Sequence, residues 1–287
     1  MKEYSTEKIR NIALVSHSGA GKTILSEAML HFSGATTRMG KIEDGTTASD
    51  FDEEEARRTI SLYTSVIPVE YRDTKINFLD TPGFTDFIGE VISALRVADG
   101  AVVVVDAVNG LEVGAEIAWN YCTEFHLPRF LLINKMDREN ANFQKALKSV
   151  EEFSEIRLIP IQLPWGEKQG FQGVIDLIKM KAITWDGDGK DAKLVESEIP
   201  ADLADKAAEF RGAMIEAAVE MDDAAMEAYL EGNEPDADTL RKLIRKATIS
   251  GTFYPMLCGS AFKNKGVQPL LDAVVDFLPS PADREAY

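Results

Sequence analysis

Apolar runs alternate with amphipathic stretches along most of the chain, and each run is short enough to form one strand. Residues 9–15, 102–105 and 130–133 are nearly uninterrupted runs, which are typical of strands buried on both faces. We expect strands at 9–15, 62–71, 76–79, 102–105, 130–133 and 254–258, and helices at 24–30, 86–95, 113–124, 142–153 and 267–278. This alternation predicts an α/β fold in three layers, with a mostly parallel sheet and an antiparallel hairpin at its edge.

The pattern changes between residues 158 and 250. Short apolar runs at 159–185 are separated by Gly and Pro, which indicates short strands and turns. Amphipathic helices are expected at 202–220, 222–230 and 236–247, each with an aspartate at or near its start. We therefore divide the chain into an α/β domain of residues 1–157 and 251–287 and an inserted α+β subdomain of residues 158–250.

The turn Ser-His-Ser-Gly-Ala-Gly-Lys-Thr links the first expected strand to the first helix at residues 16–23. Small residues let backbone N–H groups surround a phosphate, and the helix N-terminus adds partial positive charge. Lys22 would then reach the β- and γ-phosphates, and Thr23 would hold Mg²⁺. The expected nucleotide contacts are His17, Ser18, Gly19, Ala20, Gly21, Lys22 and Thr23. Ser16 replaces the first glycine of the usual pattern, and the turn alone also fits a plain strand–helix connection.

A second motif, Asp-Thr-Pro-Gly at residues 80–83, follows an expected strand. In a protein with a phosphate-binding loop, an aspartate at this strand end meets Mg²⁺ through water, and the glycine N–H senses the γ-phosphate. Taken alone, the same four residues form an ordinary turn. The preceding polar segment, residues 34–58, has no clear period, and a connection of this length is usually functional or mobile.

Two further motifs follow buried strands: Asn134-Lys135-Met136-Asp137 and Gly259-Ser260-Ala261, and we expect Ser260, Ala261 and the next residue, Phe262, to contact the nucleotide. The Asp137 carboxylate can accept both N1–H and N2–H₂ of guanine, which adenine does not offer. Asn134 and Lys135 would hold the loop and the base, and small residues at 260–261 let a backbone N–H approach the guanine O6. The four motifs in this order predict a protein that binds GTP or GDP, and Asp137 disfavours the alternative of an ATP-dependent kinase.

Composition narrows the class of protein further. The formal net charge of −17 disfavours sequence-independent binding to nucleic acid, so we expect no DNA partner. Two cysteines far apart in the sequence indicate a reducing compartment. The longest apolar run is too short to span a bilayer, and the N-terminus lacks an apolar signal region. We expect a cytoplasmic protein that does not interact with membranes.

With these motifs, the chain resembles the first domain of the elongation factor G family of translational GTPases. The resemblance extends over almost the whole chain and includes residues 10–12, 20–23, 80–83, 134–138, 259–268 and, in the insertion, 162–164 and 229–232. It implies a P-loop NTPase fold, GTP hydrolysis with Mg²⁺, a ribosome partner, contact of the insertion with the ribosomal stalk protein, and a monomer. In the family four more domains follow, so we expect that this chain corresponds to an excised first domain.

Several residues depart from the family pattern. Phe84 stands where the family has a histidine that orients the attacking water, and Ser61 replaces the threonine of switch one that holds Mg²⁺. Ser18 and Gly19 also differ from the family residues. Following the resemblance, we expect Lys22, Gly83 and Ser61 to act in catalysis and Thr23, Ser61 and Asp80 to hold the metal ion. Phe84 implies slow hydrolysis without the ribosome, and the alternative is a ribosome-binding module that GTP switches with negligible intrinsic hydrolysis.

Overall fold

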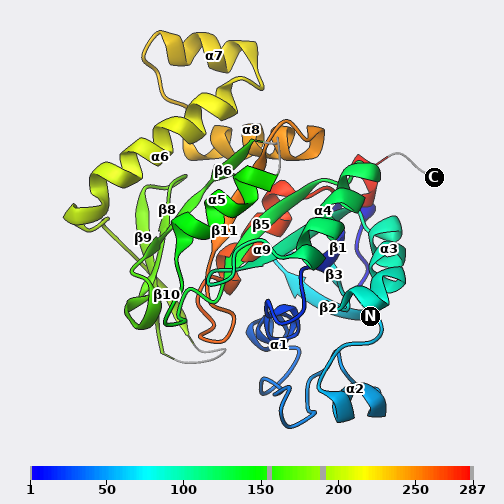
Figure 1. Ribbon diagram of the computed structural model, residues 1–287. Helices are drawn as coiled ribbons and strands as arrows, with labels where there is room; N and C mark the ends of the chain where they lie inside the picture. Colours follow the sequence, from blue (N-terminus) through cyan, green and yellow to red (C-terminus); the bar gives the residue numbers. More distant parts are fainter. Residues whose placement is uncertain (1, 154–156, 188–191, 285–287) are drawn as a thin grey trace.

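Seven strands form the central sheet of the computed structural model, which describes residues 2–153, 157–187 and 192–284 (Figure 1). They are β1 (Ile9–Val15), β2 (Ser65–Tyr71), β3 (Thr74–Asp80), β4 (Gly100–Asp106), β5 (Arg129–Asn134), β6 (Leu158–Pro160) and β11 (Tyr254–Cys258). Their order is β2-β3-β1-β4-β5-β11-β6, and all pairs are parallel except β2 with β3. The predicted α/β fold with a mostly parallel sheet is confirmed, and the antiparallel hairpin lies at its edge.

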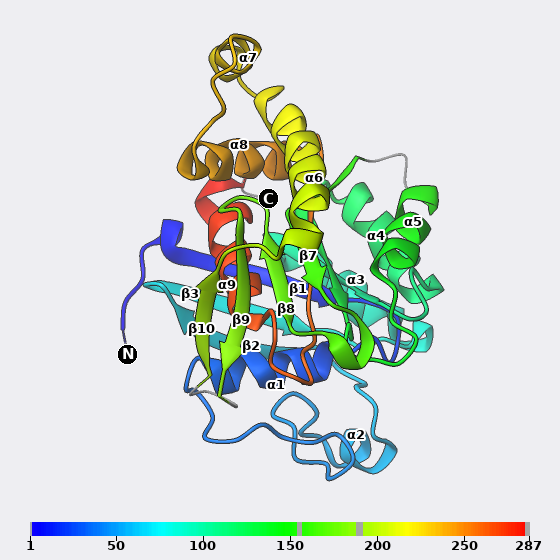
Figure 2. The same ribbon diagram turned by 90° about the vertical axis from the view of Figure 1, so that its left-hand side faces the viewer.

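Helices cover both faces of this sheet (Figure 2). On one face α1 (Lys22–Phe32) packs against α9 (Val267–Phe277), and on the other α3 (Ile88–Val97) packs against α4 (Val113–Glu124), beside α5 (Phe143–Phe153). This double cover buries β4 along its whole length, which explains its apolar run. In the described part of the chain, no helix is both long and apolar enough to cross a membrane.

A second, four-stranded antiparallel sheet has the order β10-β9-β8-β7. Its strands are β7 (Gln162–Trp165), β8 (Gly173–Asp176), β9 (Lys181–Asp186) and β10 (Lys193–Ser197), and they are followed by α6 (Ala201–Val219), α7 (Asp223–Leu230) and α8 (Ala237–Ser250). Strand β6, which begins at residue 158, pairs with β11 of the central sheet. The central sheet therefore includes the first residues of the expected insertion, and the division into two domains stays a prediction.

The polar segment between α1 and β2 is held by two buried glutamates. Glu27 on α1 accepts the backbone N–H groups of Gly40 at 2.6 Å and Ala48 at 2.5 Å. Glu55 lies in the short helix α2 (Glu53–Arg58) and accepts two backbone N–H groups beyond the end of that helix. Figure 1 shows this segment at the end of the molecule opposite α7. Each half of the segment is thus fixed by one buried carboxylate that accepts hydrogen bonds from backbone N–H groups. The sequence analysis expected no regular element in this segment.

Candidate functional site

The loop between β1 and α1 has the backbone conformation that a phosphate-binding loop requires. Gly19 and Gly21 have φ angles of +80° and +102°, a region that side chains with a Cβ rarely adopt. A Cβ at Gly21 would also lie 2.6 Å from Nδ2 of Asn134. The loop therefore needs glycine at position 21 for two reasons: the positive φ angle and the close approach of the Asn134 side chain at the end of β5.

Lys22 is the buried cation of this loop, with 6 % of its surface exposed. Its ammonium group donates to Oγ of Ser16 at 2.8 Å and lies 3.5 Å from the carbonyl oxygen of His17. Burial lowers the pKa of Lys22 to about 8, while the nearby Asp80 and Asp50 carboxylates oppose that shift. A bound polyphosphate would replace these weak partners with negative charge and hold Lys22 in its charged form.

Oxygen atoms suited to a hard cation gather beside Lys22. The hydroxyl groups of Thr23 and Ser61 lie 3.4 Å apart, and Ser61 donates to Oδ1 of Asp50 at 2.7 Å. Ser26 donates to Oδ2 of Asp80, whereas Oδ1 of Asp80 is buried and has no hydrogen-bond partner among the described residues. Burial raises the pKa of Asp80 to about 6, and Lys22 limits the rise. This donor set fits Mg²⁺, which prefers oxygen ligands and completes its shell with water and phosphate.

The described residues offer a metal ion no larger cluster of acidic, histidine or thiol side chains. Within residues 2–153, 157–187 and 192–284, no group of three or more His, Cys, Asp or Glu side chains has a metal-binding arrangement. A magnesium ion at Thr23 and Ser61 would therefore depend on phosphate oxygens for much of its coordination. This dependence is typical of nucleotide-linked magnesium sites.

Asn134 connects the phosphate loop to the loop after β11. Its Nδ2 donates to the carbonyl oxygen of Ala20 at 2.9 Å, and its Oδ1 accepts the N–H of Ala261 at 2.9 Å. The neighbouring Lys135 has a φ angle of +65° and forms an ion pair of 2.7 Å with Asp106. Both contacts fix the carboxyl end of β5, where ligands bind in sheets of this topology.

Asp137 lies half-buried at the same edge and is oriented by Ser260. The Ser260 hydroxyl donates to Oδ1 of Asp137 at 2.5 Å and accepts the N–H of Lys263 at 3.2 Å. The loop after β11 therefore positions the Asp137 carboxylate but leaves its second oxygen for another donor. A purine base with two adjacent N–H groups is a suitable donor.

One cavity of about 650 Å³ joins these two ends of the site. Among the residues expected at the nucleotide, ten line it: Ser18, Gly19, Gly21, Lys22, Thr23, Asn134, Lys135, Asp137, Ala261 and Phe262. The other three, His17, Ala20 and Ser260, do not line the cavity but form hydrogen bonds near it. Ala20 accepts from Asn134, Ser260 donates to Asp137, and Nδ1 of His17 accepts the N–H of Gly114 at 3.2 Å.

Residues expected to act at the γ-phosphate lie around the same cavity. Ser61 and Gly83 line it, and a Cβ at Gly83 would lie 2.8 Å from the ammonium nitrogen of Lys22. Phe84 also lines the cavity, with 40 % of its surface exposed. Asp80 does not line it and lies buried below, bonded to Ser26. A Cβ at residue 83 would also lie 2.6 Å from the Cα of Ser18 in the phosphate loop, and this backbone contact leaves room only for glycine.

Sequence reasoning missed the part of the lining that the polar segment provides. Residues 39–43, Asp50 and residues 59–60 lie along the cavity, and Glu27 holds this segment against α1. The length of the connection was the signal that this segment has a functional role. The individual residues that line the cavity were not identifiable from the sequence, because their positions depend on how the segment folds back against α1.

Known proteins share this arrangement of motifs. The family model described as the elongation factor Tu GTP binding domain matches residues 7–280. The chain belongs to this family. The chain is 45 % identical over 283 residues, 99 % of its length, to elongation factor G of Granulibacter bethesdensis, and it covers 41 % of that protein.

A solved structure has the same fold over nearly the whole chain. The chain matches a crystal structure of a protein from Thermus thermophilus with a TM-score of 0.90 and 36 % identity. The match covers 97 % of this chain and 41 % of that one. The chain thus spans about two-fifths of the length of the relatives that it matches.

Proposed function

We propose that the cavity binds GTP and that the domain hydrolyses it as part of an elongation factor G-like translation factor. The observation that carries the proposal is that Lys22 and Asp137 line one cavity, although they lie 115 positions apart in the sequence. A single guanine nucleotide would place its phosphates at Lys22 and its base at Asp137. Its ribose would lie between them, so the two ends of the cavity match the two ends of the ligand.

The residues around the γ-phosphate support in-line attack by water. Lys22 and the backbone N–H groups of the phosphate loop would bind the phosphoryl oxygens and stabilise the negative charge that develops on them. The N–H of Gly83 would contact the γ-phosphate and order the loop that carries Phe84. Mg²⁺, held by Thr23 and Ser61 with Asp80 acting through water, would supply further charge neutralisation when bound.

Phe84 sets the rate in this proposal. Its side chain has no group that donates or accepts a proton, so it does not orient water as a histidine would. We therefore infer slow hydrolysis by the isolated domain and stimulation by the ribosome, the partner suggested by the named relative, elongation factor G. The proposal also includes a cytoplasmic monomer whose insertion contacts the ribosomal stalk protein.

Single-turnover hydrolysis of GTP, with and without ribosomes, tests the proposal in a full-length factor that carries this domain. Phe84→His should raise the ribosome-stimulated rate, whereas the matched Phe84→Leu variant should not. Equal or lower turnover of the histidine variant would contradict the role given to Phe84. Competition between GDP and ADP tests the nucleotide itself, and a preference for ADP would end the proposal of a GTPase.

The second candidate is a module that GTP switches between conformations without measurable hydrolysis. Phe84 and the loss of a methyl group at Ser61 are the features that favour it. In this case, GTP would strengthen ribosome binding while the single-turnover rate stays at background even with ribosomes. Stimulated hydrolysis would exclude this candidate.

A further inference from the structure

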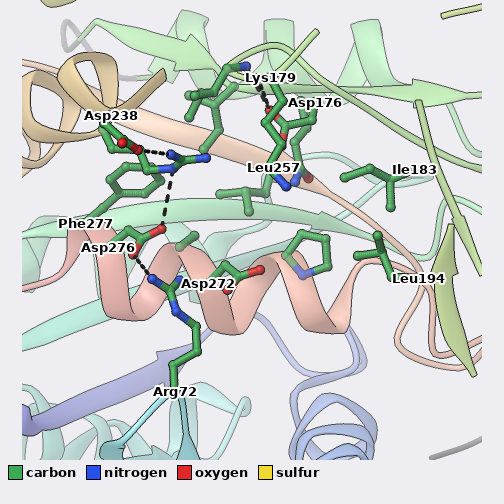
Figure 3. Close-up of a pocket in the computed structure, with 16 residues that line it drawn as sticks. Arg72, Asp176, Lys179, Ile183, Leu194, Asp238, Leu257, Asp272, Asp276 and Phe277 are labelled. Carbon is green, nitrogen blue, oxygen red and sulfur yellow. Dashed lines mark hydrogen bonds and ion pairs between the residues drawn. The ribbon is translucent and has the colours of Figure 1, made fainter. Parts of the chain in front are cut away.

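A second cavity, of about 370 Å³, lies where strands β7–β10 and helix α8 of the expected insertion meet α9, and it shares no lining residue with the nucleotide cavity. Its walls come from β7 to β10, from α8 and α9, from the β2–β3 turn, and from β11. Figure 3 shows Ile183 and Leu194 grouped at one end, while Asp238 and Asp276 lie at the other. The cavity therefore has both an apolar end and a charged end, and its volume falls in the range of small-molecule sites, about 300–1,000 Å³.

Most of the lining charges neutralise one another. Arg72 forms ion pairs with Asp272 at 2.8 Å and with Asp276 at 2.9 Å (Figure 3). Arg241 pairs with Asp238 at 2.7 Å, and its Nε lies 3.9 Å from Asp276. These cations join the β2–β3 turn, α9 and α8 into one network. The network closes one wall of the cavity and leaves these aspartates little affinity for another cation.

Asp176 is different, because no cation forms an ion pair with it in the described part of the chain. Its Oδ1 accepts the backbone N–H groups of Ile178 at 2.8 Å and Lys179 at 3.0 Å, whereas the Lys179 ammonium group pairs with Glu196. No described residue donates a hydrogen bond to Oδ2. Burial raises the pKa of Asp176 above its ordinary value, although the backbone N–H groups oppose that rise. Among the described residues Asp176 thus has no ion-pair partner, and the more distant charges of Lys179 and Arg241 only oppose the rise of its pKa.

Gln162 lies directly opposite Asp176 on the neighbouring strand. The two are register partners of β7 and β8, so their side chains share a face with Cβ atoms about 4.5–5.5 Å apart. Gln162 is 5 % exposed and lines the cavity, and its Oε1 is buried without a hydrogen-bond partner in the described chain. Rotation of the amide can exchange its oxygen and nitrogen atoms, so the group can offer an acceptor to the cavity. Unsatisfied buried polar groups of this kind are rare and costly.

We propose that this cavity binds a small amphipathic amine, whose ammonium group is held between the Asp176 carboxylate and the Gln162 amide. The ammonium group supplies the direct ion pair that Asp176 lacks and, once the amide has rotated, a donor for the Gln162 oxygen. The apolar body of the ligand packs against Ile183 and Leu194. An anion would face an unpaired carboxylate, and a neutral apolar molecule would leave both polar groups unsatisfied, so the cavity should discriminate against both.

Methyl NMR of the whole chain, labelled at isoleucine δ1 methyl groups, tests the proposal with 2-phenylethylamine as the probe. A ligand of about ten non-hydrogen atoms should bind with a Kd on the order of 1 mM. Saturable shifts are expected at Ile161, Ile178 and Ile183, which line the cavity, and not at Ile12 in the core of the central sheet. Under the same conditions, 3-phenylpropionate and 3-phenyl-1-propanol should give no saturable shifts.

Two variants separate a built site from an unspecific crevice. Asp176→Asn removes the charge but keeps an oxygen for the two backbone donors, and it should weaken amine binding by about tenfold, the factor expected for one charged hydrogen bond. Gln162→Leu should weaken binding as well and decides the question if the first variant does not fold. Asp202→Asn, an exposed carboxylate on α6, is the matched control and should bind like the original protein.

Three results would overturn the proposal. The first is the absence of saturable shifts up to roughly 20 mM amine, well above the expected Kd. The second is equal binding of the anion or the alcohol, since the polar pair would then not select the ligand. The third is an unchanged Kd in both Asp176→Asn and Gln162→Leu.

Discussion

Replacing Asp137 by asparagine tests how this domain selects its base. The Ser260 hydroxyl already holds Oδ1 of Asp137 at 2.5 Å, so the substitution changes the charge and the donor pattern of a positioned group. Guanine presents N1–H and N2–H₂, which need two acceptors. Xanthine has an oxygen at C2 instead of the amino group, and the asparagine amide can donate to that oxygen.

The structure sets the size of the effect. Two hydrogen bonds to a charged acceptor contribute about 1.5–3 kcal/mol each. Asp137 is half-buried, so solvent screens it and the lower value applies to each bond. Asp137→Asn should therefore cost GDP about 3 kcal/mol, which corresponds to a roughly 100-fold weaker Kd. Xanthosine diphosphate should gain affinity in the same variant because the repulsion by the carboxylate is removed.

Competition against a fluorescent guanine nucleotide measures both affinities. Glu139→Gln removes one exposed negative charge two residues away and is the matched control, which should leave the preference for GDP unchanged. Thermal unfolding of both variants checks that the fold is retained. A loss of GDP affinity below about threefold, or no gain for xanthosine diphosphate, would show that Asp137 does not contact the base.

Three further predictions concern packing around the site. Glu27→Ala should accelerate hydrogen exchange of the Gly40 and Ala48 amides by at least about tenfold, since each amide loses a charged acceptor. The control variant Glu27→Gln should keep one of the two bonds. Unchanged exchange in Glu27→Ala would contradict the proposal that Glu27 holds the polar segment. Gly83→Ala should abolish tight nucleotide binding in equilibrium titrations, because its Cβ would meet the phosphate loop; binding at the original affinity would be inconsistent with that geometry. Burial raises the pKa of Cys122 from 9.0 to about 12. At pH 8 its thiolate fraction, and with it the rate of labelling by a thiol reagent, should therefore be about 10³-fold lower in the native than in the unfolded chain. Fast labelling of the native chain would show that the thiol is accessible.

Local pattern in the sequence predicted the strands of the central sheet except β6, which was assigned to the insertion, and most of its helices. Burial on both faces requires an almost continuous apolar strand, as in β4, and helical spacing marks the layers that cover the sheet. Helix α2 also had a local signal that was overlooked, because Asp52 and Glu55 form a capping box at its start. Each of these features depends on residues only a few positions apart.

Motifs at strand ends predicted which residues would approach a nucleotide, because parallel strands present their carboxyl ends at one edge of the sheet. The cavity that joins Lys22 to Asp137 agrees with this expectation in its geometry, while the role of each residue in binding stays a prediction. The anchoring of the polar segment by Glu27 was not predictable. Glu27 accepts backbone N–H groups of residues 13 and 21 positions further along the chain, and every residue type except proline has such a group.

The sequence by itself determined the type and order of the elements and the chemistry at the ends of the strands, because these follow from periodicity and from neighbouring residues. Only the tertiary structure decided that Gln162 and Asp176 face a common cavity beside α9. No local pattern marks this pair. Within the described chain, the Gln162 oxygen without a partner and the Asp176 carboxylate without an ion pair result from where β7, β8, α8 and α9 meet. An unsatisfied polar group is recognisable only when all of its neighbours in space are known.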